Sequence, residues 1–101
     1  MDKDSLVRKL NSVGKDAFVS HYSIFKDYAR GKVSKERAIE ELISEGRSNY
    51  DGAAIRLSNA SLIFREGVNC DALIIIQRSQ RLAFQTVSLA KAIYESECVA
   101  K

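Results

Sequence analysis

Proline is absent from all 101 residues of the chain, and this absence constrains the fold more than any other single feature. Proline breaks helices because it lacks a backbone N–H and its ring collides with the preceding turn. A chain without it is free to form successive helices joined by short connections. Apolar residues make up 46% of the sequence, which is enough to build one packed core. We therefore expect a single helical domain over residues 1–101.

The first 30 residues carry an apolar stripe at helical spacing, which predicts an amphipathic helix from about 4 to 30. Asp4 is placed to cap its beginning, and Gly31 to end it. Gly14 interrupts the pattern, and Asp16 could cap a second helix, so a division into two shorter helices stays open. The stripe consists of Leu6, Leu10, Val13, Ala17, Ile24 and Tyr28.

Two further helices are predicted in the middle of the chain. Ser34 is a plausible N-cap for a helix over 34–44. Ser48 and Asp51 have the spacing of a capping box, which predicts a helix from about 49 to 66. When its residues are placed at 100° intervals, this helix has apolar side chains on two opposite sides.

The chain after Asn69 contains neither glycine nor proline, and it begins with a continuous apolar run over 72–76. This run is long enough for a buried strand or for part of a buried helix. We favour helix because good helix formers surround the run and no partner strand is predicted elsewhere. The segment forms either one helix of nearly 30 residues or two helices divided near Ser79 and Gln80, and we predict the division. The expected fold is all-α, a compact bundle of four or five helices.

The side chains that most often carry catalysis are few and isolated in this sequence. His21 is the one histidine, and neither a nucleophile nor a carboxylate lies near it at helical spacing. Cys70 lies at a predicted helix start, which lowers a thiol pKa, but no basic residue is close to it in sequence. The main acidic residues share one predicted helix and are typical of a solvated face: Glu36, Glu40, Glu41 and Glu45. We expect no enzyme activity, no cofactor and no metal site.

The cysteines and the terminal residues bear on the compartment. Cys70 and Cys98 are too few and too far apart for a metal motif, so we expect two reduced thiols. The first five residues have no apolar stretch, and no run is long enough to cross a membrane. These features predict a cytoplasmic protein that does not enter membranes. The formal charge of +3 is too small to indicate a partner by itself.

The two-sided apolar pattern of residues 49–66 suggests a contact surface. Ile55, Asn59 and Leu62 have the spacing of a short helical seam, and an asparagine in such a seam selects register and partner. Leu73 and Ile76 belong to an apolar run that also needs cover on every side. The cover comes either from the rest of the chain or from a second molecule. Our first hypothesis is a non-catalytic interaction module that forms a homodimer or binds another protein.

A second hypothesis is a helix-turn-helix-like protein that binds DNA. The predicted helices at about 34–45 and 49–66 are joined by a short turn that contains glycine, which is the outline of that motif. Two features count against it: Ile55 and Leu62 lie on the face that would enter the groove, and the net charge is low. The side chains that would contact the nucleic acid are Arg47, Arg56, Asn59 and Arg65.

Overall fold

The computed structural model describes residues 1–46 and 49–99, and these residues form α-helices and connecting turns without a β-strand. The all-α class is confirmed. The described residues contain seven helices, not the expected four or five, because the first segment divides into three; the last divides into two, as predicted. The helices are α1 (Lys3–Val13), α2 (Lys15–Ser20), α3 (Tyr22–Ala29), α4 (Lys35–Ser44), α5 (Tyr50–Arg65), α6 (Asn69–Gln77) and α7 (Phe84–Glu97).

The first predicted helix breaks at Gly14 and again at His21. Gly14 has a φ of +92°, a conformation that side chains with a Cβ rarely adopt, and the chain turns there between α1 and α2. His21 ends α2 and begins α3 with a φ of −116° and a ψ of 24°. Asp2, not Asp4, caps α1: its carboxylate accepts a hydrogen bond from the Ser5 backbone N–H at 2.8 Å.

The middle helices begin close to where the sequence predicts. Ser34 caps α4, as expected, and its hydroxyl oxygen accepts a hydrogen bond from the Arg37 backbone N–H at 3.1 Å. Asn49 caps α5, and its side-chain oxygen accepts from the Gly52 backbone N–H at 2.8 Å. The expected cap, Ser48, lies outside the described residues. Asn49 performs the same task, because its side chain also satisfies a free N–H of the first turn.

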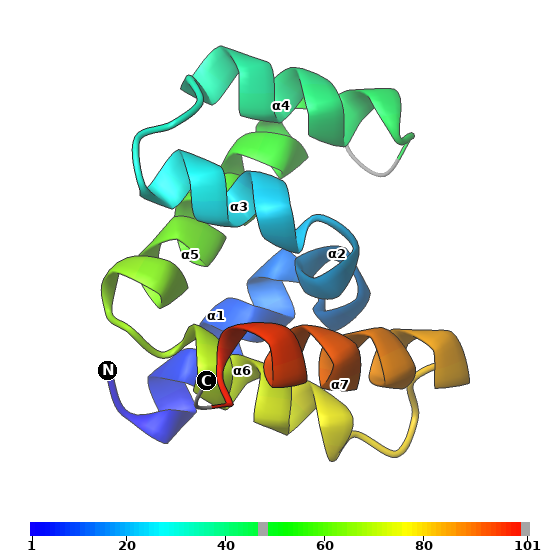
Figure 1. Cartoon of the computed structure of the whole chain (residues 1–101). Helices are drawn as coiled ribbons and strands as arrows, with labels where there is room; N and C mark the ends of the chain where they lie inside the picture. Colours follow the sequence, from blue (N-terminus) through cyan, green and yellow to red (C-terminus); the bar gives the residue numbers. More distant parts are fainter. Residues whose placement is uncertain (47–48, 100–101) are drawn as a thin grey trace.

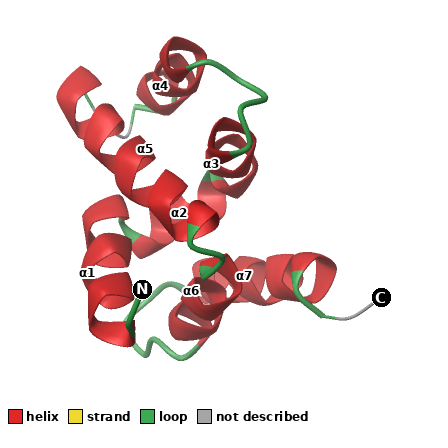
Figure 2. Ribbon diagram, turned by 90° about the vertical axis from the view of Figure 1, so that its left-hand side faces the viewer, coloured by secondary structure: helices red, strands yellow, loops and turns green. Residues whose placement is uncertain are grey.

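Helix α5 occupies the centre of the molecule. It crosses between α1 on one side and α3 and α4 on the other, and it also contacts α6 (Figures 1 and 2). Phe18 and Tyr22 place their rings against Phe64 of α5, with centroids 5.8 and 5.0 Å apart. The Cα radius of gyration is 12.7 Å, near the roughly 13 Å of a compact domain of 100 residues.

Helices α6 and α7 form a hairpin, so the predicted division of the last segment is confirmed. The chain leaves α6 after Gln77 and enters α7 at Phe84. Two hydrogen bonds join this hairpin to α2. The Lys15 ammonium donates to the Ser79 hydroxyl at 2.9 Å, and the buried Thr86 hydroxyl donates to the Asp16 carboxylate at 2.9 Å.

Candidate functional site

The two sides of α5 differ sharply in exposure, so the structure shows which of its two apolar sides the rest of the chain covers. One side lies in the core, with Ala53, Leu57, Ala60, Ser61 and Ile63 buried. The opposite side, which we call the outer face of α5, is exposed or half-buried. It consists of Asp51, Ile55, Ser58, Asn59, Leu62, Arg65 and Glu66.

Two aliphatic residues lie in the middle of this otherwise polar face. Ile55 is 57% exposed, and Leu62, two turns further on, is half-buried. Asn59 lies between them, and its amide group donates a hydrogen bond to the Ile55 carbonyl oxygen at 3.0 Å. This bond holds the Asn59 side chain against its own helix. The arrangement is a narrow apolar strip on a helix whose other side is already covered.

The prediction for Leu73 and Ile76 is wrong. We expected them to contribute to a contact surface, but both are 0% exposed and belong to the core of the chain. The rest of the molecule, including α7, covers Ala72, Leu73 and Ile76 of the apolar run, while Ile74 and Ile75 stay half-buried. The alternative explanation for this run, cover from its own chain, is therefore the correct one in the folded protein.

The described residues proposed for DNA contact do not all lie on one face. The Arg56 guanidinium lies against Gly14, with Nη1 3.6 Å from the point that a Cβ would occupy there. Arg56 is thus turned toward the junction of α1 and α2, and Arg47 lies outside the described residues. Only Asn59 and Arg65 lie on the outer face of α5. One exposed arginine and an asparagine bonded within its own helix provide little to read bases or hold phosphates.

His21 is buried at 7% exposure, and its ring meets Phe25 edge-on at 6.2 Å. It borders a groove of about 600 Å³ between α3, the end of α4 and α7. Glu41 and Glu45, two of the acidic residues predicted on a solvated face, lie on the rim of this groove. Among the described residues, no three His, Cys, Asp or Glu side chains lie close enough together to hold a metal ion.

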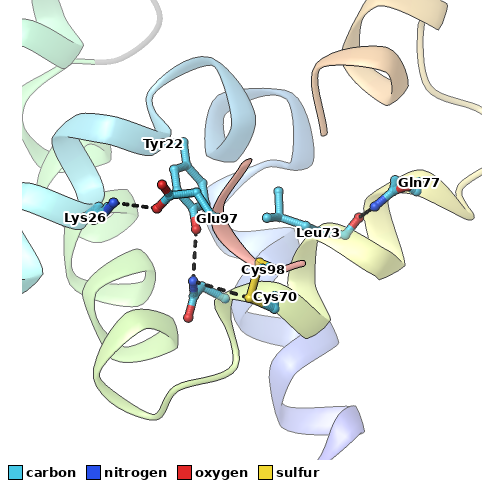
Figure 3. The surroundings of a disulfide bond; sticks show 8 residues. Tyr22, Lys26, Cys70, Leu73, Gln77, Glu97 and Cys98 are labelled. Atoms are coloured by element: carbon cyan, nitrogen blue, oxygen red, sulfur yellow. Dashed lines mark hydrogen bonds and ion pairs between the residues drawn. A yellow bond between two sulfur atoms is a disulfide. The ribbon is translucent and has the colours of Figure 1, made fainter. Parts of the chain in front are cut away.

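The cysteines also require a correction. Cys70, in the first turn of α6, and Cys98, at the end of α7, form a disulfide (Figure 3). The prediction of two reduced thiols is wrong for this structure, and Cys70 is not a free nucleophile. The expectation of a cytoplasmic location rested on those thiols and loses that support. The sequence indicated this pair only indirectly. Cys70 lies near the beginning of α6 and Cys98 follows the end of α7, and these two ends come together when the helices form a hairpin.

Two polar contacts surround the disulfide and hold α3 to the hairpin. Lys26 of α3 forms an ion pair with Glu97, one residue before Cys98 (Figure 3). The side-chain amide of Asn69 donates a hydrogen bond to the Tyr22 hydroxyl oxygen at 2.9 Å. Burial raises the pKa of the Tyr22 phenol above its ordinary value, so this ring stays neutral over a wider pH range.

A second exposed apolar region lies at the beginning of α7, and the sequence did not draw attention to it. Phe84, the first residue of α7, is 71% exposed. It borders a hollow of about 540 Å³ beside the end of α6. We call this region the Phe84 surface. Its residues are Gln77, Phe84, Val87, Ser88 and Lys91.

No protein-family model, no curated protein and no solved structure matches this chain. None of the described helices has the length and apolar character needed to cross a bilayer.

Proposed function

We propose that this chain is a non-catalytic interaction module that forms a homodimer through the outer face of α5. The exposure of Ile55, at 57% in the middle of that face, is the observation that carries the proposal. Leu62 lies seven residues further along the same face. A helix of a second molecule laid along α5 would remove both side chains from water without any change in the rest of the fold.

A twofold, antiparallel pairing of the two α5 helices suits this face. If the axis passes between Ser58 and Asn59, Ile55 of each copy meets Leu62 of the other, so the same strip serves both partners. The charges at the ends of the strip also complement each other. In this register position 51 lies opposite position 66, so Asp51 of each copy comes near both Arg65 and Glu66 of the other. Glu66 is paired with the N-terminal ammonium of its own chain at 3.3 Å, so Arg65 is the cation that pairs with Asp51.

The strip is short, so we expect a weak and reversible dimer. One helix face buries less than the roughly 1,200–2,000 Å² of a stable interface. Each isoleucine that becomes buried contributes about 1.5–3 kcal/mol to the free energy of dimerisation. Because of the twofold symmetry, each dimer buries two copies of Ile55. Replacement of Ile55 by a charged residue should therefore weaken the dimer by more than about 100-fold.

Sedimentation equilibrium over a range of concentrations tests the proposal with Ile55→Asp and Leu62→Asp. Leu89→Asp is the matched control, because Leu89 is also an exposed leucine but lies on α7. We expect dimers of the wild type and of the control, and monomers of the two α5 variants. A wild type that stays monomeric at its solubility limit would remove the proposal.

A charge exchange tests the geometry separately from the apolar strip. Asp51→Arg and Arg65→Asp should each weaken the dimer, and the double variant should recover it, because the antiparallel pair is then restored in reverse. Circular dichroism of the monomers checks that α5 remains folded in each variant. If the double variant loses as much dimerisation free energy as the two single variants together, the antiparallel arrangement is wrong.

A further inference from the structure

The Phe84 surface combines an exposed aromatic ring with groups that suit a nucleobase. The ring of Phe84 is 71% exposed at the first residue of α7. The hollow beside it is lined by Gln77 and Ser88, which donate and accept hydrogen bonds, and by Lys91. The lining of the hollow is mostly apolar, so the site presents a flat apolar surface with the polar groups of Gln77, Ser88 and Lys91 beside it.

The chain around this surface is positively charged. Residues 72–94 contain three basic residues and no aspartate or glutamate. All three, Arg78, Arg81 and Lys91, are exposed, and Arg81 and Lys91 lie on either side of Phe84 in the sequence. Lys15 of α2 adds a further cation at the hairpin loop, where its ammonium is bonded to Ser79. Asp16 of α2 is an acidic residue that contacts α7, and its carboxylate accepts the hydrogen bond of the Thr86 hydroxyl.

We infer that the Phe84 surface binds single-stranded nucleic acid. One base stacks on the Phe84 ring, with its edge above Gln77 and Ser88. Phosphates on either side of that base are neutralised by Arg81 and Lys91. Stacking on an aromatic residue in a basic groove is the usual way in which proteins hold single strands. This site is on a different element from the α5 strip and stands independently of the proposed dimer.

Three other occupants fit the surface less well. A second copy of the chain would bring two sets of like charges together. A membrane needs one continuous apolar face, but Phe84 and Leu89 lie about 140° apart around α7, and the exposed Gln85 lies between them. Duplex DNA keeps its bases stacked inside the helix, so it offers no free base to the ring.

The magnitude of each contribution follows from the groups involved. Loss of one stacking partner weakens binding of a strand by roughly 5- to 150-fold. Arg81, Lys91 and Lys15 together give about three phosphate contacts. For a single strand, each contact adds about −0.7 to the slope of the logarithm of the binding constant against the logarithm of salt concentration. We therefore expect the logarithm of the binding constant to fall with the logarithm of salt concentration with a slope of about −2.

Fluorescence anisotropy tests the inference with the whole chain and labelled oligothymidylate and oligouridylate of about 12 nucleotides, a length within known site sizes. A duplex of the same length and vesicles that contain phosphatidylserine serve as the competing ligands. The variants are Phe84→Ala, Phe84→Trp and Lys91→Gln. The matched controls are Leu89→Ala and Arg8→Gln, an exposed leucine and an exposed arginine outside the site.

We expect both single strands to bind at low salt more tightly than the duplex. Phe84→Ala should weaken binding about tenfold or more, Phe84→Trp should retain it, and Lys91→Gln should reduce the salt slope. The two controls should bind like the wild type. The inference is overturned if neither strand binds at low salt, if vesicles bind in preference to strands, or if Phe84→Ala binds as tightly as the wild type.

Discussion

The disulfide between Cys70 and Cys98 provides the sharpest prediction about stability. It joins the first turn of α6 to the end of α7, so the hairpin is closed by a covalent bond at one end and by its loop at the other. Thr86 and Ala90 are the only buried residues of α7, and Ile93 and Tyr94 pack half-buried against the core, so the disulfide is a main constraint on the position of this helix. Removal of the disulfide should therefore destabilise the protein and affect α7 first.

The magnitude follows from the length of chain that the bond closes. The two cysteines are 28 positions apart. In the chain-entropy treatment, a closed loop of this length restricts the unfolded chain by about 3.6 kcal/mol at 25 °C. Small domains have total stabilities of about 5–15 kcal/mol, so this loss is a large share of the total. With a urea slope of roughly 1–3 kcal/mol per molar, the unfolding midpoint should fall by between about 1 and 4 M.

Urea unfolding followed by circular dichroism measures this loss in the double variant Cys70→Ala/Cys98→Ala. The wild type is measured with and without dithiothreitol, and the variant, which has no thiols, is the control for any other effect of the reductant. Hydrogen exchange should show that the amides of α7 lose protection before those of α5. A double variant with the same midpoint as the oxidised wild type would refute the reasoning. Thiol titration of the unfolded wild type should find no free thiol, and two free thiols would refute the disulfide itself.

Three further predictions concern single residues. Phe18→Ala should lower the free energy of unfolding by about 3–5 kcal/mol, because Phe18 is fully buried. Phe84→Ala, at an exposed ring, should change it by less than about 0.5 kcal/mol, and urea unfolding compares the two variants. Gly14→Ala should lower stability by about 1–2 kcal/mol in thermal unfolding, because alanine is strained at a φ of +92°. The raised pKa of Tyr22 stabilises the fold fully below pH 10.0, and this contribution is lost as pH rises through the folded-state pKa. As pH rises from neutral to above 10.0, Tyr22→Phe should therefore lose less stability than the wild type, which urea unfolding at a series of pH values measures.

Local signals in the sequence predicted the helices well, because each depends on a few neighbouring residues. The cap at Ser34 and the division between α6 and α7 are confirmed. The break at His21 was not predicted, since no glycine or proline marks it. Phe18 and Tyr22, on either side of this break, both pack against Phe64 of α5, and such long-range packing is not visible in the sequence.

The contact surface was harder to predict because coverage depends on the whole fold. The periodicity of α5 correctly separates two apolar sides, but it does not say which side the chain covers. Ile55 and Leu73 looked alike as candidates, and the structure exposes the first and buries the second completely. The disulfide was missed for the same reason, since Cys70 and Cys98 become neighbours only after α6 and α7 fold back on each other.

The position of the disulfide also makes the two proposed surfaces separable by experiment. Cys98 lies at the opposite end of α7 from Phe84, a distance of about 20 Å along a helix of 14 residues. The α5 strip is carried by a helix that packs against α1, α3, α4 and α6, whereas α7 packs against α6 and α2. Loosening of α7 should therefore weaken binding of single strands, which needs Phe84 and Lys91 in fixed positions on one helix. Dimerisation should be retained in the double cysteine variant. A loss of both activities together would mean that α5 depends on the hairpin for its own position.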